Sequence, residues 1–180
     1  MRKFLYLSIL IALFMGCGDG VASKGFIFRL KSFDGKGVDI AVNGGRYRFI
    51  NLKNRIIIVN IFATWCPPCI GEIPHLNALQ RKYKDKIDVL GILLYDNELG
   101  NGNLKRFIKD NRVEFFISNS NRENSRFTKF LAPKLRLKPN FSIPLTIMFV
   151  DGRYFTHYEG SVPEEMVESD IKQATLILSK

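Results

Sequence analysis

The most constraining feature of the sequence is a pair of cysteines, Cys66 and Cys69, separated by two prolines. The pair follows an apolar run rich in β-branched residues, and a segment with helical periodicity, 70–84, comes directly after it. A helix N-terminus presents unpaired N–H groups and the positive end of the helix dipole, which favour a thiolate over a thiol. Because the thiolate is the nucleophile in disulfide exchange, this arrangement predicts a redox-active pair of cysteines at the end of a strand.

Two other interpretations of the cysteine pair compete with this one. The pair could be half of a zinc site. However, the chain has only one further cysteine and two histidines, His75 and His157, whose spacing is not that of a zinc finger. A purely structural disulfide is also conceivable, but a loop this short restricts the unfolded chain very little. We therefore expect a redox pair and no metal site.

Length and composition are those of one domain with an N-terminal extension. The chain has 180 residues, and its hydrophobic fraction of 46% is enough for a core but too low for a protein with many membrane spans. The net charge of +10 is compatible with binding to an anionic partner. Because the lysines and arginines are scattered and no nucleic-acid motif accompanies them, we expect a basic solvated surface and no nucleic-acid partner.

The N-terminus has the pattern of an export signal. A positive start is followed by an apolar run of twelve residues, 4–15, which as a helix reaches about 18 Å and cannot cross a hydrocarbon core of about 30 Å. The sequence Gly16-Cys17-Gly18 resembles the lipobox of bacterial lipoproteins. By that resemblance, residues 1–16 are a signal peptide, Cys17 is lipidated, 17–25 is a tether and 26–180 is the folded domain. An uncleaved anchor or an ordinary signal peptide remains the alternative.

The cysteine count agrees with lipid attachment. If Cys17 carries lipid, only Cys66 and Cys69 remain, and they form one pair without a stray thiol in an oxidising compartment. We therefore expect a membrane-anchored lipoprotein whose domain faces the periplasm or the extracytoplasmic side.

Hydrophobic periodicity and turn signals predict an alternating α/β chain. The first two expected strands form a β-hairpin-like addition that leads into the main sheet. Asn103 and Ser161 are the expected helix caps, and Pro74 should kink the helix that contains it. The expected strands are 26–30, 47–52, 54–63, 87–94, 115–118, 144–150 and 153–158, and the expected helices are 70–84, 104–111, 122–131 and 163–178.

The order of these elements and motifs resembles the thioredoxin fold, and more closely the membrane-tethered thiol-disulfide oxidoreductases of the ResA, TlpA and CcmG family. The resemblance runs from about residue 30 to the end. It implies an α/β, thioredoxin-like fold with a central mixed sheet flanked by helices. Asn60 occupies the position of the buried acid of thioredoxin. The resemblance is carried by 59–69, Glu72, Pro74, 143–146, 150–152 and Gly160.

The resemblance also implies roles for single residues. Cys66, expected at the exposed end of the helix, is the attacking nucleophile, and Cys69 resolves the mixed disulfide. Glu72 modulates the cysteines or shuttles protons, although an exposed Glu is also favoured near any helix N-terminus.

The remaining candidate residues bind substrate. Trp65 forms an aromatic wall beside the thiols, unless it packs in the core. Pro144 is the cis-proline that exposes the backbone of Ile143 to a substrate strand, unless it is a trans proline that starts a strand.

The resulting hypothesis is an extracytoplasmic protein disulfide reductase. Pro67 and Pro68 lack N–H groups, so few amide donors stabilise the Cys66 thiolate and the couple is less oxidising. The resemblance implies protein disulfide substrates, apocytochrome c among them, a membrane thiol electron donor, and no cofactor beyond the Cys66–Cys69 disulfide. A copper-handling module, a peroxidase and a non-catalytic binding lipoprotein are the alternatives. The Cys-x-x-Cys spacing disfavours the copper module, and the lack of a Thr-x-x-Cys motif disfavours the peroxidase.

Overall fold

A computed structural model describes residues 25–96 and 100–180 of the chain. The predicted signal peptide, Cys17 and all but the last residue of the tether lie outside the described residues. The centre of the fold is a five-stranded sheet in the order β6-β5-β4-β7-β8. β4 pairs in parallel with β5 and antiparallel with β7, which makes the sheet mixed. Its strands are β4 (Ile56–Phe62), β5 (Ile87–Leu93), β6 (Phe116–Ser118), β7 (Leu145–Val150) and β8 (Arg153–Glu159).

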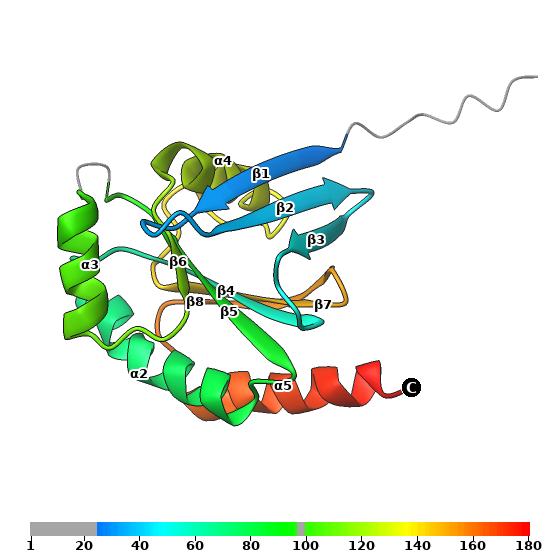
Figure 1. The fold of residues 1–180 in the computed structure, drawn as a ribbon. Coiled ribbons are helices and arrows are strands. Elements are labelled where there is room, and N and C mark those ends of the chain that lie inside the picture. Colours follow the sequence, from blue (N-terminus) through cyan, green and yellow to red (C-terminus); the bar gives the residue numbers. More distant parts are fainter. Residues whose placement is uncertain (1–24, 97–99) are drawn as a thin grey trace, which may run out of the picture.

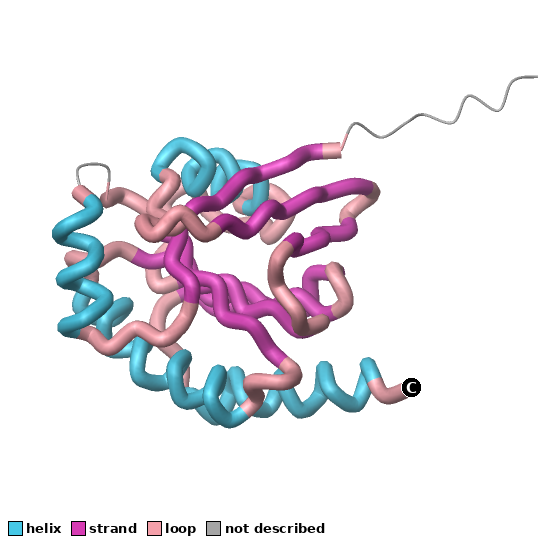
Figure 2. Tube along the Cα trace, in the orientation of Figure 1, coloured by secondary structure: helices cyan, strands magenta, loops and turns pink. Residues whose placement is uncertain are grey.

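Helices and a second sheet cover the two faces of this central sheet (Figure 1). On one face lie α2 (Pro67–Lys82) and α5 (Glu164–Leu178), with α3 (Asn101–Asp110) beside them. On the other face lie a three-stranded sheet and α4 (Asn121–Leu131). Figure 2 shows the strands of the central sheet with helices on one side and the three-stranded sheet and α4 on the other. The architecture confirms the expected thioredoxin-like α/β fold.

The central strand β4 supplies both hydrophobic cores. All seven of its residues are buried, as expected for a β-branched run that is covered on both faces. Successive side chains of a strand point to opposite faces. Accordingly, Ile56 and Ile58 belong to the core under α2 and α5, whereas Ile57 and Val59 belong to the core under the three-stranded sheet.

The N-terminal addition is a three-stranded antiparallel sheet of β1 (Phe26–Lys31), β2 (Gly37–Asn43) and β3 (Arg46–Ile50). The sequence predicted two of these strands and took 37–43 for part of the connection. The missed strand alternates half-buried and buried residues. Its half-buried positions hold Gly37, Asp39 and Ala41, which are poor strand formers and hide the alternation.

A tight turn joins the two sheets. In the turn between β7 and β8, Asp151 and Gly152 both have positive φ, as in a type I′ hairpin turn. The Tyr47 N–H of β3 donates to the Gly152 carbonyl at 2.6 Å, and a Cβ at Gly152 would lie 2.6 Å from the Tyr47 carbonyl oxygen. Glycine is therefore required here both by φ and by the close approach of β3.

Both predicted helix caps, Asn103 and Ser161, are wrong. Asn103 lies inside the first turn of α3, whose N-cap is Gly100. Ser161 does not cap α5, because the N-cap is Pro163 and the Ser161 hydroxyl donates instead to the Pro68 carbonyl at 3.2 Å. Helix α2 continues through Pro74.

Among the helices of the described residues, none combines the length and the apolar character that crossing a membrane requires. The start of β1 and the start of α2 lie at opposite ends of the molecule, to the upper right and to the left in Figure 1.

Candidate active site

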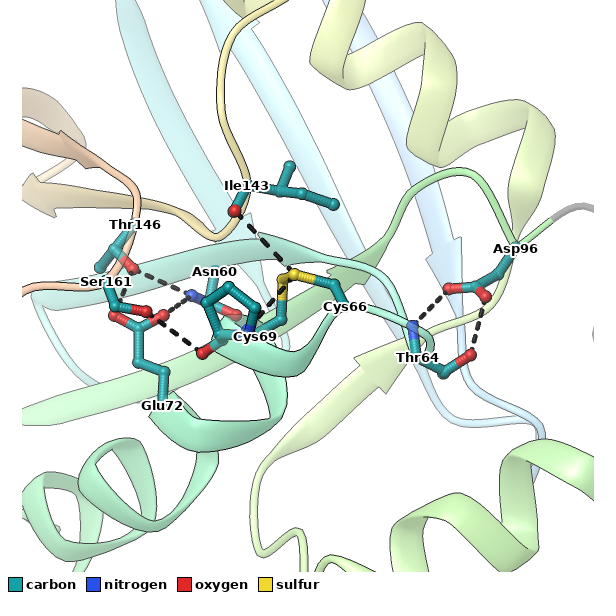
Figure 3. The surroundings of a disulfide bond; sticks show 10 residues. Asn60, Thr64, Cys66, Cys69, Glu72, Asp96, Ile143, Thr146 and Ser161 are labelled. Carbon is teal, nitrogen blue, oxygen red and sulfur yellow. Dashed lines mark hydrogen bonds between the residues drawn. A yellow bond between two sulfur atoms is a disulfide. The ribbon is translucent and has the colours of Figure 1, made fainter.

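Cys66 and Cys69 form a disulfide at the start of α2 (Figure 3). Cys66 is the N-cap residue with an extended backbone, and the two prolines occupy the first helical positions, where a missing N–H costs nothing. The Cys69 N–H donates to the Cys66 sulfur at 3.3 Å, whereas the Ile70 N–H donates to the Cys66 carbonyl at 3.1 Å. Of the two amides that could serve the sulfur, only that of Cys69 therefore does so.

The disulfide lies just beneath the surface. Cys66 is 5% exposed and Cys69 is 1% exposed, so both cysteines are buried although the sequence placed Cys66 at the exposed end of the helix. The neighbours of Cys66 in the chain lie at the surface: Pro67 is exposed, and Trp65 is 62% exposed. Trp65 is thus a surface residue beside the disulfide and does not pack in the core.

The segment before β7 faces the Cys66 sulfur. The Ile143–Pro144 bond is cis, as the sequence predicted. The Ile143 carbonyl oxygen lies 3.9 Å from the Cys66 sulfur. This is a contact and not a hydrogen bond while the sulfur is in a disulfide, because the sulfur then carries no hydrogen. The Pro144 carbonyl accepts a hydrogen bond from the Gly160 N–H at 2.8 Å, which fixes the segment to the end of β8.

A buried polar trio lies under the disulfide, formed by Asn60, Glu72 and Thr146 (Figure 3). The Asn60 amide donates to Glu72 Oε2 at 2.8 Å and to Thr146 Oγ1 at 2.9 Å. The Thr146 hydroxyl donates to Glu72 Oε1 at 3.3 Å. Glu72 is only 4% exposed, so the alternative of a solvated glutamate at a helix start is wrong. Its position three residues after Cys69 places both side chains on one face of α2.

Burial sets the electrostatics of this trio. Loss of hydration raises the pKa of the Glu72 carboxyl above its ordinary value, because burial penalises the charged form. The hydrogen bonds from Asn60 and Thr146 and the charge of His75 act in the opposite direction. The site therefore holds a carboxyl group that gains a proton more readily than an exposed one.

A second set of contacts, which sequence reasoning missed, fixes the segment before Cys66. The carboxylate of Asp96 accepts hydrogen bonds from the N–H of Thr64 at 2.9 Å and from its hydroxyl at 2.8 Å. The Trp65 indole N–H donates to the Tyr95 carbonyl at 3.3 Å. A signal for this contact exists in the sequence. Thr64 and Asp96 each follow the end of a predicted strand, and these two strands pair in parallel, so their ends meet at one edge of the sheet.

Comparison with known proteins agrees with this geometry. A family model described as Redoxin matches residues 30–174. The chain belongs to the redoxin family. A curated relative, the thiol-disulfide oxidoreductase ResA of Bacillus cereus, is 29% identical to this redoxin over 139 residues, which are 74% of this chain and 72% of the relative.

Two solved structures share the fold of this redoxin. The thiol:disulfide interchange protein of the thioredoxin family from Chlorobium tepidum matches with a TM-score of 0.62 and 22% identity, and the match covers 87% of this chain and 99% of that one. StoA from Bacillus subtilis matches with a TM-score of 0.56 and 19% identity over 80% of this chain and 95% of that one. Together, the family and its relatives identify a thioredoxin-like thiol-disulfide oxidoreductase.

The two histidines of this redoxin lie away from the sulfurs in contacts of their own. The His75 ring pairs with Glu164 of α5 at 3.0 Å, and the His157 ring contacts the Tyr154 hydroxyl at 2.7 Å. Within residues 25–96 and 100–180, no three side chains of the His, Cys, Asp and Glu types gather as a metal site would need. The disulfide at the start of α2 is suited to thiol–disulfide exchange.

Proposed function

We propose that this chain reduces disulfide bonds of other proteins on the extracytoplasmic side of a membrane. The observation that carries the proposal is the Cys66–Cys69 disulfide at the N-cap of α2, with the Ile143 carbonyl 3.9 Å from the Cys66 sulfur. In that position a substrate strand that pairs with the backbone of Ile143 brings its own sulfur to Cys66. Trp65, the residue before Cys66, is exposed and is the proposed aromatic wall beside the reacting sulfur.

The reaction begins from the dithiol form. The Cys66 thiolate attacks one sulfur of the substrate disulfide, a bond forms between Cys66 and that sulfur, and the substrate's second sulfur leaves as a thiolate and takes up a proton. The Cys69 thiolate then attacks the Cys66 sulfur. The Cys66–Cys69 disulfide forms, the bond to the substrate breaks, and the substrate departs with both of its cysteines reduced.

Glu72 is the proposed proton acceptor for Cys69. A thiol must lose its proton before it attacks, and a base with a raised pKa holds that proton better than an ordinary carboxylate does. Burial raises the pKa of Glu72, and hydrogen bonds from Asn60 and Thr146 fix the carboxyl orientation. The same face of α2 carries both Cys69 and Glu72, which makes the transfer a local one.

The direction of the reaction follows from the weak stabilisation of the thiolate. Strong oxidants of this kind owe their potential to a reduced form that is stabilised. Here Pro67 and Pro68 have no N–H to offer, and the Ile70 amide is used by the Cys66 carbonyl. We expect a potential nearer to the value of about −270 mV for thioredoxin than to about −120 mV for DsbA. Equilibration with glutathione buffers measures it, and a value close to that of DsbA would overturn the reductant assignment.

The cellular setting is proposed from the sequence. The apolar run 4–15 and Cys17 support export and lipid attachment, and the cysteine count leaves one redox pair outside the cytosol. By resemblance to the ResA, TlpA and CcmG family, the proposed substrates include the oxidised cysteine pair of apocytochrome c, and the electrons come from a membrane thiol carrier. Membrane association that persists after replacement of Cys17 by alanine and a high-salt wash would contradict lipid attachment.

Insulin reduction tests the core of the proposal. The protein should accelerate the reduction of insulin by dithiothreitol, and Cys66→Ser should abolish the effect because the attacking sulfur is gone. Cys17→Ser in the same assay is the matched control and should retain full activity. Cys69→Ala should instead accumulate a mixed disulfide with substrate on Cys66, visible on a non-reducing gel. A protein that leaves the rate unchanged would contradict the proposal and favour a non-catalytic binding lipoprotein.

A further inference from the structure

We propose that a pocket beside the disulfide is a subsite for an aromatic side chain with a polar tip, such as tyrosine, of the substrate polypeptide. The inference rests on the proposed function, because it names the part of a protein substrate that this site would recognise. The pocket has a volume of about 460 Å³, which falls at the lower end of the range for ligand pockets. Its walls include Leu94, Tyr95, Thr128, Ala132, Pro139 and Phe141.

Two walls of the pocket are linked to the surroundings of the reacting sulfur, each through one other residue. Tyr95 accepts the hydrogen bond of the Trp65 indole, and Trp65 precedes Cys66 in the chain. Phe141 comes two residues before Ile143, whose carbonyl contacts the Cys66 sulfur, so the chain places the two residues within about 7 Å of each other. Figure 3 shows Asp96 and Ile143 on two sides of the disulfide, with the yellow-green ribbon of α4 beyond them. A substrate strand that pairs with Ile143 would therefore extend toward Phe141, which lines this pocket.

The lining is mostly carbon. Leu94 is buried, Ala132 and Phe141 are half-buried, and Tyr95 is 55% exposed. Lys129 also lines the pocket, with an exposed side chain. Other pockets of similar volume, such as the one beside the β7–β8 turn with Arg46, Arg48 and Arg55, are lined by several charged groups and share no residue with the segments around the disulfide. The pocket beside the disulfide is thus the one suited to an apolar ring.

One polar atom indicates that the occupant also has a hydrogen-bonding group. The hydroxyl oxygen of Thr128 is covered and has no hydrogen-bond partner, although such groups are nearly always paired. A threonine on a helix populates two χ1 rotamers, and rotation between staggered positions exchanges the places of its hydroxyl and its methyl group. A phenol or an indole N–H inside the pocket would supply the missing partner, as buried tyrosine and tryptophan side chains require.

Peptide substrates test the subsite. Disulfide-linked peptides with tyrosine, phenylalanine or alanine two residues from the reacting cysteine, on either side, are reduced by the reduced protein. The rate is followed by the fluorescence of Trp65, the only tryptophan in the chain. The tyrosine peptide should react at least about tenfold faster than the alanine peptide, as the filling of a hydrophobic pocket implies. The phenylalanine peptide should lie between them.

Variants test whether the preference for the tyrosine peptide arises in this pocket. Ala132→Phe places a ring in the pocket and should bring the ratio of the tyrosine rate to the alanine rate close to one. Thr128→Val should remove the advantage of tyrosine over phenylalanine and leave that of phenylalanine over alanine. Ala41→Phe, on the half-buried outer face of β2, is the matched control and should keep the full ratio. Equal rates for all three peptides, or a ratio that survives Ala132→Phe, would overturn the proposal.

A redox-independent measurement separates this proposal from the function on which it rests. If the reduced protein reacts with no disulfide, the proposed function is wrong. The same peptides with serine in place of cysteine are then titrated against Trp65 fluorescence. Tighter binding of the tyrosine peptide, weakened by Ala132→Phe, supports the subsite, and equal binding of the tyrosine and alanine peptides overturns it.

Discussion

The two faces of the central sheet differ in what covers them and in what they do. The face under α2 and α5 carries the disulfide and, among aliphatic side chains, the buried trio of Asn60, Glu72 and Thr146. The face under β1–β3 carries aromatic contacts such as Phe28 with Phe127, at 5.1 Å between ring centroids. Strand β4 serves both faces with alternate residues. The comparison teaches that alternate residues of one strand can support a reactive disulfide on one side and an aromatic core on the other.

The largest expected effect is a loss of stability after a substitution in the aromatic core, on the face covered by β1–β3 and α4. Phe127 is fully buried, and its replacement by alanine should lower the free energy of unfolding by about 3–5 kcal/mol through lost burial and the cavity left behind. The redox potential of the disulfide should stay as in the wild type. Urea unfolding and glutathione equilibration measure the two quantities.

Phe26→Ala is the matched control for this prediction. Phe26 is 50% exposed and also contacts an aromatic ring, that of Phe130, so its loss should cost clearly less than that of Phe127. A shift in redox potential that accompanies Phe127→Ala would show that the two faces are not separate in function.

Two buried asparagines, one beside the disulfide and one in α4, allow the two faces to be compared with the same substitution. Asn60 donates to Glu72 and Thr146 under the disulfide, and Asn124 donates to the carbonyls of Leu93 and Ser118 at the start of α4. Replacing either by alanine leaves buried polar groups without partners and should cost about 1–3 kcal/mol of stability. Only Asn60→Ala should also alter the pH profile of disulfide exchange, because it removes a hydrogen bond that lowers the pKa of Glu72. Identical pH profiles for the two variants would refute the role of the trio.

The smallest expected effect is the dependence of stability on pH that Glu72 causes. Because burial raises the pKa of Glu72 above its ordinary value of 4.5, the folded state holds this proton more tightly than a solvated carboxyl in an unfolded chain does. Its contribution is therefore fully present below pH 4.5 and is lost as the pH rises through the folded pKa. Glu72→Gln cannot ionise, so its stability relative to the wild type should rise with pH from 4 to 8. The difference between the two urea midpoints measures this, and a difference that is flat with pH would contradict the assignment.

Much of the fold and of the sulfur chemistry could be predicted because the signals are local. The β-branched run before Trp65 and the helix after Cys69 lie next to the cysteines in the sequence, and both are present as β4 and α2. The cis bond before Pro144 followed from the resemblance alone. The missed strand β2 has weak strand formers on its solvent side, so only its pairing with β1 and β3 reveals it.

The rest of the site depends on contacts between residues far apart in the chain. Buried Glu72 has its hydrogen-bond partners in Asn60, 12 positions away, and Thr146, 74 positions away. The hydrophobic periodicity of a helix does not indicate such contacts. The prediction that Ser161 caps α5 was wrong for the same reason. The Ser161 hydroxyl, 93 positions from Pro68, bonds across to the start of α2 instead of capping its own helix.

The positions of β1 and of the disulfide determine the orientation that the domain takes when its N-terminus is attached to a support. The chain enters β1 at one end of the domain, and α2 begins at the other (Figure 1). Any support joined through the N-terminus, whether a bilayer, a bead or a sensor chip, would thus hold the domain by the end remote from its sulfurs. Partners arriving from solution could then approach the end that carries the sulfurs, and a fusion partner could be attached at the opposite end.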